Sequence, residues 1–409
     1  MAMPCWLPEL SIKPDKVRAM PKRFDCIVIG SGLAGISAAL QLQDKGIDVT
    51  LLEASDRPGG RIATDSIDGY LCDRGFQLIN SKYPSLAELN VIDEIEFIAA
   101  PRVIEVALDD SRHPIGDPRT APFSILDRAT GTIPEKLGLL RVILSKPRKD
   151  QSIGESLSVL GTTYERTLRP FLTGVFLADP DNVDARYGVS ILRSFVNGEP
   201  GLPRYGVGQL PTALAKRVKN LQLNTRVERI SHTTVDTSQG EYSAKKIIVA
   251  TDSTTAAQLI DLPDATPMVG CITWYHSTHI NPSGSGRLVV DGLRRGPVLN
   301  SLVVSDISRE YAPADQNLIS STTRLGSTES EVRRHLALMW GVDTRDWQLI
   351  AKYEIAAALP LQSIGKALSQ PVAVNENLYV VGDYRAVPSQ QGALFTGKLA
   401  AELIFNQGI

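Results

Sequence analysis

The chain lacks any apolar run long enough to cross a bilayer. A membrane-spanning helix needs about 18 to 20 consecutive apolar residues, and no stretch of the chain comes close to that length. Residues 1–22 hold prolines, lysines, Asp15 and Glu9 where a secretory signal would have an apolar core. We therefore expect no transmembrane segment, and we interpret residues 1–21 as an N-terminal extension.

A surplus of one charge sign is also missing. The 43 Lys and Arg residues against 45 Asp and Glu residues give a net charge of −2, and no basic face stands out. Nucleic acid is therefore not an expected partner. The sequence also has no internal repeat and no low-complexity tract, so its 409 residues predict two or three ordinary domains of about 150 residues each.

Cysteines are few and scattered. Cys5, Cys26, Cys72 and Cys271 form neither a closely spaced metal pair nor a disulfide framework. We expect no metal site, and a reducing, cytoplasmic compartment fits this cysteine usage.

A glycine-rich turn follows the first apolar run of the chain. Cys26–Ile29 is typical of a buried parallel strand, and Gly30-Ser31-Gly32-Leu33-Ala34-Gly35 opens a helical pattern. A second apolar run, Val49–Leu52, ends at Glu53, 18 residues after Gly35. This order of strand, glycine turn, helix, strand and acid predicts a dinucleotide-binding unit.

Each residue type in this unit has a physical reason. Gly30 permits a tight turn, Gly32 lets the backbone approach a pyrophosphate, and Gly35 lets helix and strand pack closely. The helix N-terminus, at Leu33 and Ala34, offers N–H groups to the phosphates. A carboxylate at Glu53 can accept hydrogen bonds from ribose hydroxyls and disfavours a 2′-phosphate, so NADP is not expected.

The residues after the acid carry a family resemblance. The run from Glu53 and Ala54 through Arg57-Pro58-Gly59-Gly60-Arg61-Ile62-Ala63-Thr64 resembles the signature of the flavin-containing amine oxidase superfamily, which includes monoamine oxidases, protoporphyrinogen oxidase and phytoene desaturase. The resemblance implies FAD as the cofactor. It also implies that Gly59 and Gly60 pass beside the pyrophosphate and ribityl chain, and that arginines Arg57 and Arg61 meet the phosphate charge.

The C-terminus supplies an independent match to the same superfamily. Asn377–Val381 is typical of a strand and ends in Gly382-Asp383, and Gln391-Gly392-Ala393 starts an amphipathic helix. By resemblance, Asp383 holds the ribityl chain or the pyrophosphate. The N–H groups near Gly392 and Ala393 would face the pyrimidine end of the flavin, where a helix N-terminus stabilises negative charge.

Weaker resemblances lie between these two regions. Leu221–Ile230 is typical of a strand, a polar hairpin follows, and Lys246–Thr251 is a second apolar strand. The resemblance implies that Val227 contacts the adenine through its backbone and that Thr251 ends its strand beside the cofactor. It also implies that Gly75-Phe76-Gln77 passes the isoalloxazine.

These segments together define an interleaved organisation. We expect an α/β fold, with a Rossmann-like FAD-binding domain and an interleaved α+β substrate domain. Residues 22–80, 205–262 and 375–409 would build the FAD-binding domain, and residues 81–204 and 263–374 the substrate domain. Within the latter, helical patterns are expected at Thr163–Phe176 and Val189–Val196, and strands at Met268–His276, Arg287–Val290 and Val298–Val304.

The chemistry is less determined than the cofactor. A flavin performs the redox step itself, so no catalytic residue is assigned. Trp274 and Tyr275 would point to opposite faces of a strand, and Trp274, His276 and Tyr384 are the candidate substrate residues. His276 and His279 are also candidates for acid–base roles, although an ordinary core or surface histidine is the favoured interpretation of each.

Four functions remain open. The first is an FAD-dependent oxidoreductase that takes a hydride from a small apolar or aromatic metabolite and passes electrons to oxygen or a quinone. The second is a flavin amine oxidase that yields an imine and hydrogen peroxide, against which Ser389 stands where monoamine oxidases have an aromatic residue. The third is a non-catalytic carrier similar to GDP-dissociation inhibitors, and the fourth a plain NAD dehydrogenase. The Ala178-Asp179-Pro180 motif is closer to the desaturase-like and protoporphyrinogen-oxidase-like branches.

Overall fold

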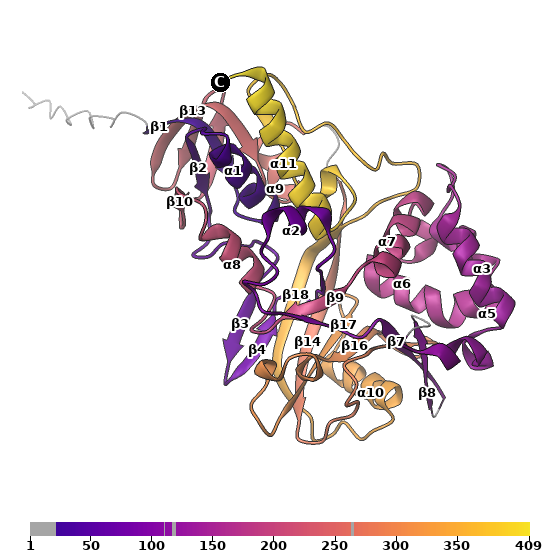
Figure 1. Cartoon of the computed structure of the whole chain (residues 1–409). Coiled ribbons are helices and arrows are strands. Elements are labelled where there is room, and N and C mark those ends of the chain that lie inside the picture. The colour runs from indigo at the N-terminus through magenta and orange to yellow at the C-terminus, as the bar shows by residue number, and fades with distance from the viewer. Residues whose placement is uncertain (1–21, 110, 117–119, 263–265) are drawn as a thin grey trace, which may run out of the picture.

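Two seven-stranded sheets organise the chain, and a helical lobe lies beside the second sheet (Figure 1). The computed structural model describes residues 22–109, 111–116, 120–262 and 266–409. The extension predicted for residues 1–21 lies outside these ranges. No helix in the described ranges is long and apolar enough to span a membrane.

The first sheet has the order β10-β2-β1-β13-β12-β11, and β19 also pairs with β13. The pairings of β10 with β2, β2 with β1, β1 with β13 and β13 with β19 are parallel, whereas β11 and β12 form an antiparallel extension. The strands are β1 (Lys22–Ile29), β2 (Val49–Leu52), β10 (Leu221–Gln222), β11 (Val227–Ser231), β12 (Thr234–Thr237), β13 (Gly240–Val249) and β19 (Leu378–Val380).

Apolar side chains cover both faces of this sheet, as is usual for parallel strands. On one face, Cys26 and Val28 pack with α1 (Leu33–Asp44) and α11 (Gln390–Gln407). On the other face, Ile27 and Ile29 pack with α9 (Ser253–Leu259) and with Tyr384.

The second sheet has the order β18-β14-β17-β16-β15-β7-β8, antiparallel except where β15 pairs with β7. Its strands are β7 (Val103–Leu108), β8 (Ser111–Gly116), β14 (Met268–Thr278), β15 (Leu288–Asp291), β16 (Val298–Val303), β17 (Asn317–Thr323) and β18 (Gln348–Pro360). Helix α10 (Glu329–Trp340) packs on one face through Val332, Leu336 and Met339. The other face contributes Tyr275, Leu302 and Leu318 to the core shared with the first sheet.

Smaller elements connect these layers. Strands β3 (Thr64–Ile67) and β4 (Tyr70–Asp73) form a hairpin, and β5 (Ile79–Asn80), β9 (Pro200–Pro203) and β6 (Phe97–Ala99) form a three-stranded sheet. The remaining helices and 3-10 turns outside the lobe are α2 (Pro84–Leu89), α8 (Gln209–Ala215), η5 (Val304–Asp306), η6 (Arg309–Tyr311) and η7 (Asp383–Arg385).

The helical lobe has its own apolar core, which includes Ile153, Leu157, Leu172 and Tyr187. Its elements are η1 (Pro122–Leu126), η2 (Arg128–Thr130), α3 (Ile133–Leu144), α4 (Ile153–Ser158), α5 (Gly161–Thr163), the π-helical turn η3 (Tyr164–Leu168), α6 (Arg169–Phe176), η4 (Pro180–Asn182) and α7 (Ala185–Asn197).

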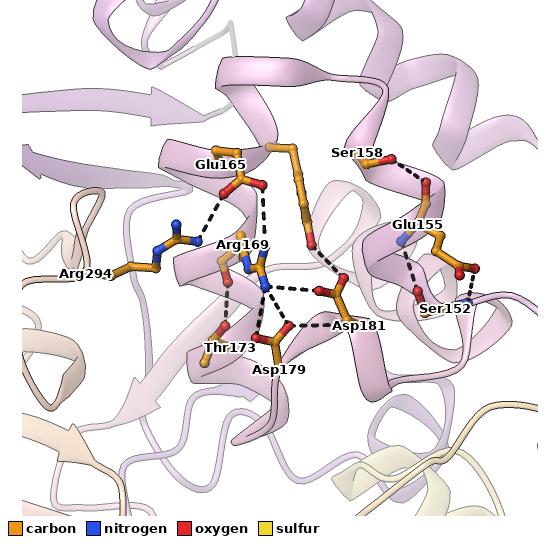
Figure 2. A network of polar contacts seen from close by, with 10 residues as sticks. Ser152, Glu155, Ser158, Glu165, Arg169, Thr173, Asp179, Asp181 and Arg294 are labelled. Atoms are coloured by element: carbon orange, nitrogen blue, oxygen red, sulfur yellow. Dashed lines mark hydrogen bonds and ion pairs between the residues drawn. The ribbon is translucent and has the colours of Figure 1, made fainter.

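An ion-pair network holds the Ala178-Asp179-Pro180 motif in this lobe (Figure 2). Arg169 at the start of α6 pairs with Asp179 at 3.1 Å and with Asp181 at 3.0 Å. Glu165 pairs with both Arg169 and Arg294, which lies in the turn between β15 and β16. Asp179 also caps the short turn η4. The motif therefore serves to fix the exit from α6.

The predicted mixed α/β architecture is confirmed, and two predicted elements are divided. The chain adopts a left-handed conformation at Asn224 (φ +54°), so Leu221–Ile230 forms β10 and β11 instead of one strand. The Thr163–Phe176 pattern is interrupted by the π turn η3 ahead of Pro170, which lacks the N–H that a continuous helix needs there. The exact domain boundaries stay a prediction.

Candidate cofactor site

The turn between β1 and α1 is shaped by its own backbone. Gly30 has φ +99° and donates its N–H to the carbonyl of Leu52 at 2.7 Å. A Cβ on Gly35 would lie 1.9 Å from the carbonyl oxygen of Gly30, so only glycine fits there. A Cβ on Gly32 would meet no atom within 4 Å. The first and third glycines thus serve the fold, whereas the second leaves open space for a ligand.

The second glycine turn lies directly against the first. The N–H of Gly59 donates to the carbonyl of Ser31 at 2.8 Å, and a Cβ on Gly60 would lie 3.6 Å from the Cα of Gly32. Gly59 and Gly60 both have positive φ, +109° and +57°. The two motifs that the sequence assigns to one cofactor therefore share one place in the fold.

Glu53 is held ionised beside these turns. Its Oε2 accepts from the N–H and hydroxyl of Ser31, both at 2.8 Å, and its Oε1 accepts from the N–H and hydroxyl of Ser55 at 2.9 and 2.8 Å. Burial alone would raise the pKa of Glu53, but these hydrogen bonds outweigh it and hold the pKa below its ordinary value. A carboxylate kept charged in this way is a strong acceptor for ribose hydroxyls.

The hydroxyl of Ser55 has an alternative acceptor, so it can give up its hydrogen bond to Glu53. The hydroxyl lies 2.7 Å from the carbonyl of Arg57 as well as 2.8 Å from Glu53. A ligand hydroxyl could therefore take its place on Glu53 without leaving the serine unpaired. The sequence reasoning did not single out Ser31 or Ser55, although both stand within the motifs it used.

Arg61 joins the glycine turns to the C-terminal motif. It donates to Asp383 at 2.6 Å and to the carbonyl of Ala358, in β18, at 2.8 Å. Asp383 is buried, and its attraction raises the pKa of Arg61 even though burial acts in the opposite direction. Arg57 instead donates to the carbonyls of Pro58 and Gly60, so its guanidinium lies over its own turn.

The N-terminus of α11 lies beside the Gly75–Gln77 segment. Gln390 donates to the side-chain oxygen of Gln77 at 3.4 Å, and Gln77 donates to the carbonyl of Arg61 at 3.2 Å. A Cβ on Gly75 would lie 2.9 Å from Ile355 of β18, and Phe76 is half-buried against the core. The segment therefore connects the helix, the Arg61 turn and the second sheet.

Two predicted backbone donors of α11 are engaged within its cap. The N–H of Gly392 donates to the hydroxyl of Ser389 at 3.0 Å, and the N–H of Ala393 donates to the carbonyl of the same serine. The groups without an intrahelical partner are those of Gln390 and Gln391 in the first turn. The side chain of Gln391 is bonded to Ser85 of α2.

The predicted adenine region lies next to Glu53. The backbone of Glu53 donates to Gln222 and accepts from Thr225, at 2.9 and 2.7 Å, and Val227 begins β11 just beyond. Thr251 follows β13, where its methyl group would lie 3.4 Å from a Cβ on Gly30. Ala54, the next residue after Glu53, belongs to the same stretch of chain.

Trp274 and His276 lie elsewhere. Both are buried on the face of β14 that packs against α10, where Trp274 donates to Thr323 at 3.0 Å and His276 lies 6.2 Å from the ring of Trp347. Tyr384 is buried with the apolar face of the first sheet. The structure therefore places Trp274 and His276 away from the glycine turns, whereas Tyr384 follows Asp383 in η7 and lies close enough to Arg61 for their charges to interact.

The sequence reasoning missed the residues that do face the cofactor half. Tyr275, on the opposite face of β14, accepts from the N–H of Asp73 at 3.1 Å and lies 6.2 Å from the ring of Tyr353. Asp73 also accepts from Thr64 at 2.5 Å and from Tyr311 at 3.0 Å. Burial raises the pKa of Asp73 to about 6 despite these hydrogen bonds. Strand alternation predicted that Trp274 and Tyr275 point to opposite faces of the sheet, but not which of the two faces the first sheet.

No group of His, Cys, Asp and Glu in the described ranges could hold a metal ion. The three described cysteines are free and buried, and burial raises the pKa of Cys72 to about 12 and of Cys271 to about 11. Such thiols are poor nucleophiles.

The glycine turns, Glu53 and the Arg61–Asp383 pair define a dinucleotide-binding protein. A family model described as "Flavin containing amine oxidoreductase" matches residues 33–405. The chain belongs to this family, which assigns FAD as its cofactor.

Curated relatives include porphyrin and terpenoid enzymes. The chain is 25% identical to chloroplastic protoporphyrinogen oxidase of Nicotiana tabacum over 292 residues, covering 58% of this chain and 52% of that protein. It is 23% identical to hydroxysqualene dehydroxylase of Sinorhizobium fredii over 437 residues, covering 95% and 99%. The match thus spans about half of the first relative and nearly all of the second.

Solved structures share the fold. A putative protoporphyrinogen oxidase from Exiguobacterium has a TM-score of 0.72 at 17% identity, covering 95% of this chain and 99% of that one. A putrescine oxidase bound to putrescine has a TM-score of 0.71 at 15% identity, covering 94% and 99%.

Proposed function

We propose that the chain is an FAD-dependent oxidoreductase that takes a hydride from a small apolar or aromatic metabolite. The observation that carries the proposal is the meeting of both glycine turns with Glu53, Arg61 and Asp383 in one place. When bound, FAD supplies a hydride acceptor at its N5 atom.

The residues of the chain bind and orient such a cofactor. Glu53 would hold the adenosine ribose, and Gly32 and Gly60 leave room for the pyrophosphate. Arg61 would meet the phosphate charge, and the first turn of α11 would face the negative charge that develops on a reduced flavin. These fits favour a flavin over a nicotinamide cofactor, which would leave the second glycine turn and the Gly382-Asp383 element without a ligand to contact.

An apolar or aromatic substrate suits the side chains beyond the cofactor segment. Tyr275, Tyr353 and Ile355 lie on the side of the second sheet that meets Gly75. The ionisable groups that pack there are already engaged, because Asp73 accepts from Tyr311 and Asp65 accepts from Tyr353. Apolar and aromatic side chains of this kind can orient an apolar molecule and exclude water.

An amine substrate, with an imine and hydrogen peroxide as products, is the alternative that the family description favours. Ser389 speaks against it, because its hydroxyl caps α11 where monoamine oxidases have an aromatic side chain that orients the amine. A carrier similar to GDP-dissociation inhibitors is not favoured, since the chain has Arg61 and Asp383 as residues that would contact the cofactor. Oxygen and a quinone both remain candidate electron acceptors.

The test is the visible spectrum of the purified protein before and after anaerobic addition of candidate substrates. Flavin bands that bleach with an apolar metabolite and return in air support an oxidase, whereas bands that return only with a quinone support a dehydrogenase. Bleaching by amines alone supports the alternative. A colourless protein that takes up no added FAD would overturn the proposal.

A further inference from the structure

The outer face of α3 carries a row of exposed apolar side chains. Ile133, Leu137, Leu140 and Leu144 follow one another at intervals of four, three and four residues, which places them on one side of the helix. Their exposed fractions are 43%, 50%, 54% and 82%. With a rise of about 1.5 Å per residue, the row is about 16 Å long.

This exposed row is distinct from the face that docks α3 on the lobe. Leu139, Val142 and Ile143 lie on the opposite side and pack against the core of the lobe. At the end of α3, Arg193 of α7 donates to the carbonyls of Ile143 and Ser145. The helix is therefore held in place by one apolar face while a second apolar face is exposed, and α3 itself lies on the outer side of the lobe in Figure 1.

The turn η1 extends the exposed surface. Phe123 and Leu126 are 80% and 59% exposed, and Lys136 of α3 donates to the carbonyls of Ser124 and Asp127 on either side of Leu126. These bonds hold η1 against α3, so the exposed apolar side chains of both elements lie on neighbouring segments of the lobe. We call the four α3 side chains with Phe123 and Leu126 the α3 patch. Contiguous exposed apolar surfaces of this kind mark interaction sites.

Basic residues gather at one end of the α3 patch. Arg141, Lys146, Arg148 and Lys149 are exposed, and the neighbouring acid, Asp150, lies 3.6 Å from Arg148. Glu135 lies at the other end of α3, where the N–H groups of Thr132 and Thr162 stabilise its charge. The end of the patch that carries Arg141, Lys146, Arg148 and Lys149, which we call the basic rim, is therefore positive, although the whole chain has a net charge of −2.

We propose that the α3 patch docks on the surface of an anionic lipid bilayer. The apolar row would enter the boundary between headgroups and acyl chains, and the basic rim would contact the headgroups. A second copy of the chain would bring the two basic rims together if the α3 helices met in parallel, and the experiment below separates this occupant from the bilayer. The inference goes beyond the proposed function and does not depend on it.

Co-flotation of the flavin-loaded protein with vesicles tests the proposal. We expect binding to vesicles of phosphatidylcholine with phosphatidylglycerol, weakening as salt is added, and little binding to phosphatidylcholine alone. The double substitution Leu137→Ser with Leu140→Ser, and separately Lys146→Glu with Lys149→Glu, should each weaken binding about tenfold or more. Leu338→Ser is the matched control, because Leu338 is a 50% exposed leucine on α10.

Each other outcome counts against the proposal. Binding that the lysine substitutions abolish and the leucine substitutions leave unchanged would show simple charge attraction. No vesicle binding, together with a dimer in size-exclusion chromatography that the leucine substitutions dissociate, would show a second copy as the occupant. Flavin content and thermal unfolding monitor the fold of each variant, and Leu144→Ser, at the most exposed position of the row, replaces the double variant if that one unfolds.

Discussion

At the scale of single residues, Glu53 links the fold to cofactor affinity. We predict that Glu53→Gln weakens FAD binding by about 10- to 100-fold, because a charge-assisted hydrogen bond contributes about 1.5–3 kcal/mol. The amide keeps the size of the side chain but loses the charge that Ser31 and Ser55 stabilise. Titration of the apoprotein with FAD, followed by flavin fluorescence, measures the change.

The matched control for this substitution is Glu88→Gln. Glu88 lies on α2, is half-exposed and pairs with Lys398 at 2.7 Å, away from the glycine turns. An FAD affinity for Glu53→Gln equal to that of the control would remove Glu53 from the ribose site.

His276 is the second residue with a measurable signature. It is fully buried, and neither ring nitrogen has a hydrogen-bond partner in the structure. Replacing an unsatisfied buried polar group by an apolar one is neutral or stabilising. We therefore predict that His276→Leu does not lower the free energy of unfolding at pH 7.5 and raises it by up to about 2 kcal/mol.

The same substitution should change the pH dependence. Burial, and then the charge of Arg333, lower the pKa of His276 to about 3, so the unfolded chain binds more protons between that pH and about 6.5. Stability contributed by this group is therefore complete above pH 6.5 and falls as the solution is acidified. Between pH 7.5 and pH 5 the wild type should lose about 2 kcal/mol more than His276→Leu.

Urea unfolding at the two pH values measures this difference. His279→Leu serves as the control, because His279 is exposed and lies on the loop that follows the same strand. Equal pH slopes for wild type and His276→Leu would contradict the assignment.

At the scale of elements, the β1–α1 turn separates folding from binding. We predict that Gly35→Ala destabilises the apoprotein by about 1–3 kcal/mol or more, because its Cβ would lie 1.9 Å from the carbonyl of Gly30. Gly32→Ala should change apoprotein stability by less than about 0.5 kcal/mol, since its Cβ meets nothing within 4 Å. The same methyl group should still lower FAD affinity at least about tenfold, because it enters the space left for the pyrophosphate.

Chemical unfolding of the two apoproteins and FAD titration of Gly32→Ala measure these effects. The two substitutions control one another, because they add the same methyl group three residues apart. Unchanged FAD affinity in Gly32→Ala would place the pyrophosphate elsewhere.

How much the sequence predicts depends on how local each feature is. The β1–α1 turn, Glu53 and Gly382-Asp383 could be predicted because each is defined by a strand and the few residues after it. Which face of β14 is turned toward the candidate cofactor site could not be predicted, because α10, more than 50 residues later in the chain, packs on Trp274 and His276. Period-two alternation separates two faces but says nothing of what covers each.

The same reasoning explains the divided strand at Leu221–Ile230. Its composition is typical of one strand, but the pairing of β10 with β2 ends at Gln222 and Asn224 turns the chain toward Glu53. That turn is set by a contact with Ser55, whose carbonyl accepts from the N–H of Asn224 at 2.9 Å. Tertiary contacts of this kind override local propensity.

At the scale of the whole molecule, Arg61 joins the two halves at the candidate cofactor site. It contacts Asp383 at the end of the first sheet and Ala358 in the second sheet. FAD that binds only the folded protein stabilises it by about 2.7 kcal/mol at a free concentration 100 times its dissociation constant. Thermal unfolding should therefore shift upward by several degrees as FAD is added to the apoprotein.

We predict that Arg61→Met lowers both the stability of the apoprotein and the stabilisation that FAD provides. The apoprotein should lose about 1–3 kcal/mol, because Asp383 stays buried without its cation and the carbonyl of Ala358 loses a donor. The upward shift with FAD should also shrink, because the phosphate charge then lacks its partner. Arg229→Met, which breaks an exposed pair with Asp236 in β12, should leave both quantities unchanged. A variant that loses apoprotein stability but keeps the full FAD-dependent shift would show that Arg61 only joins the two halves and does not meet the phosphates.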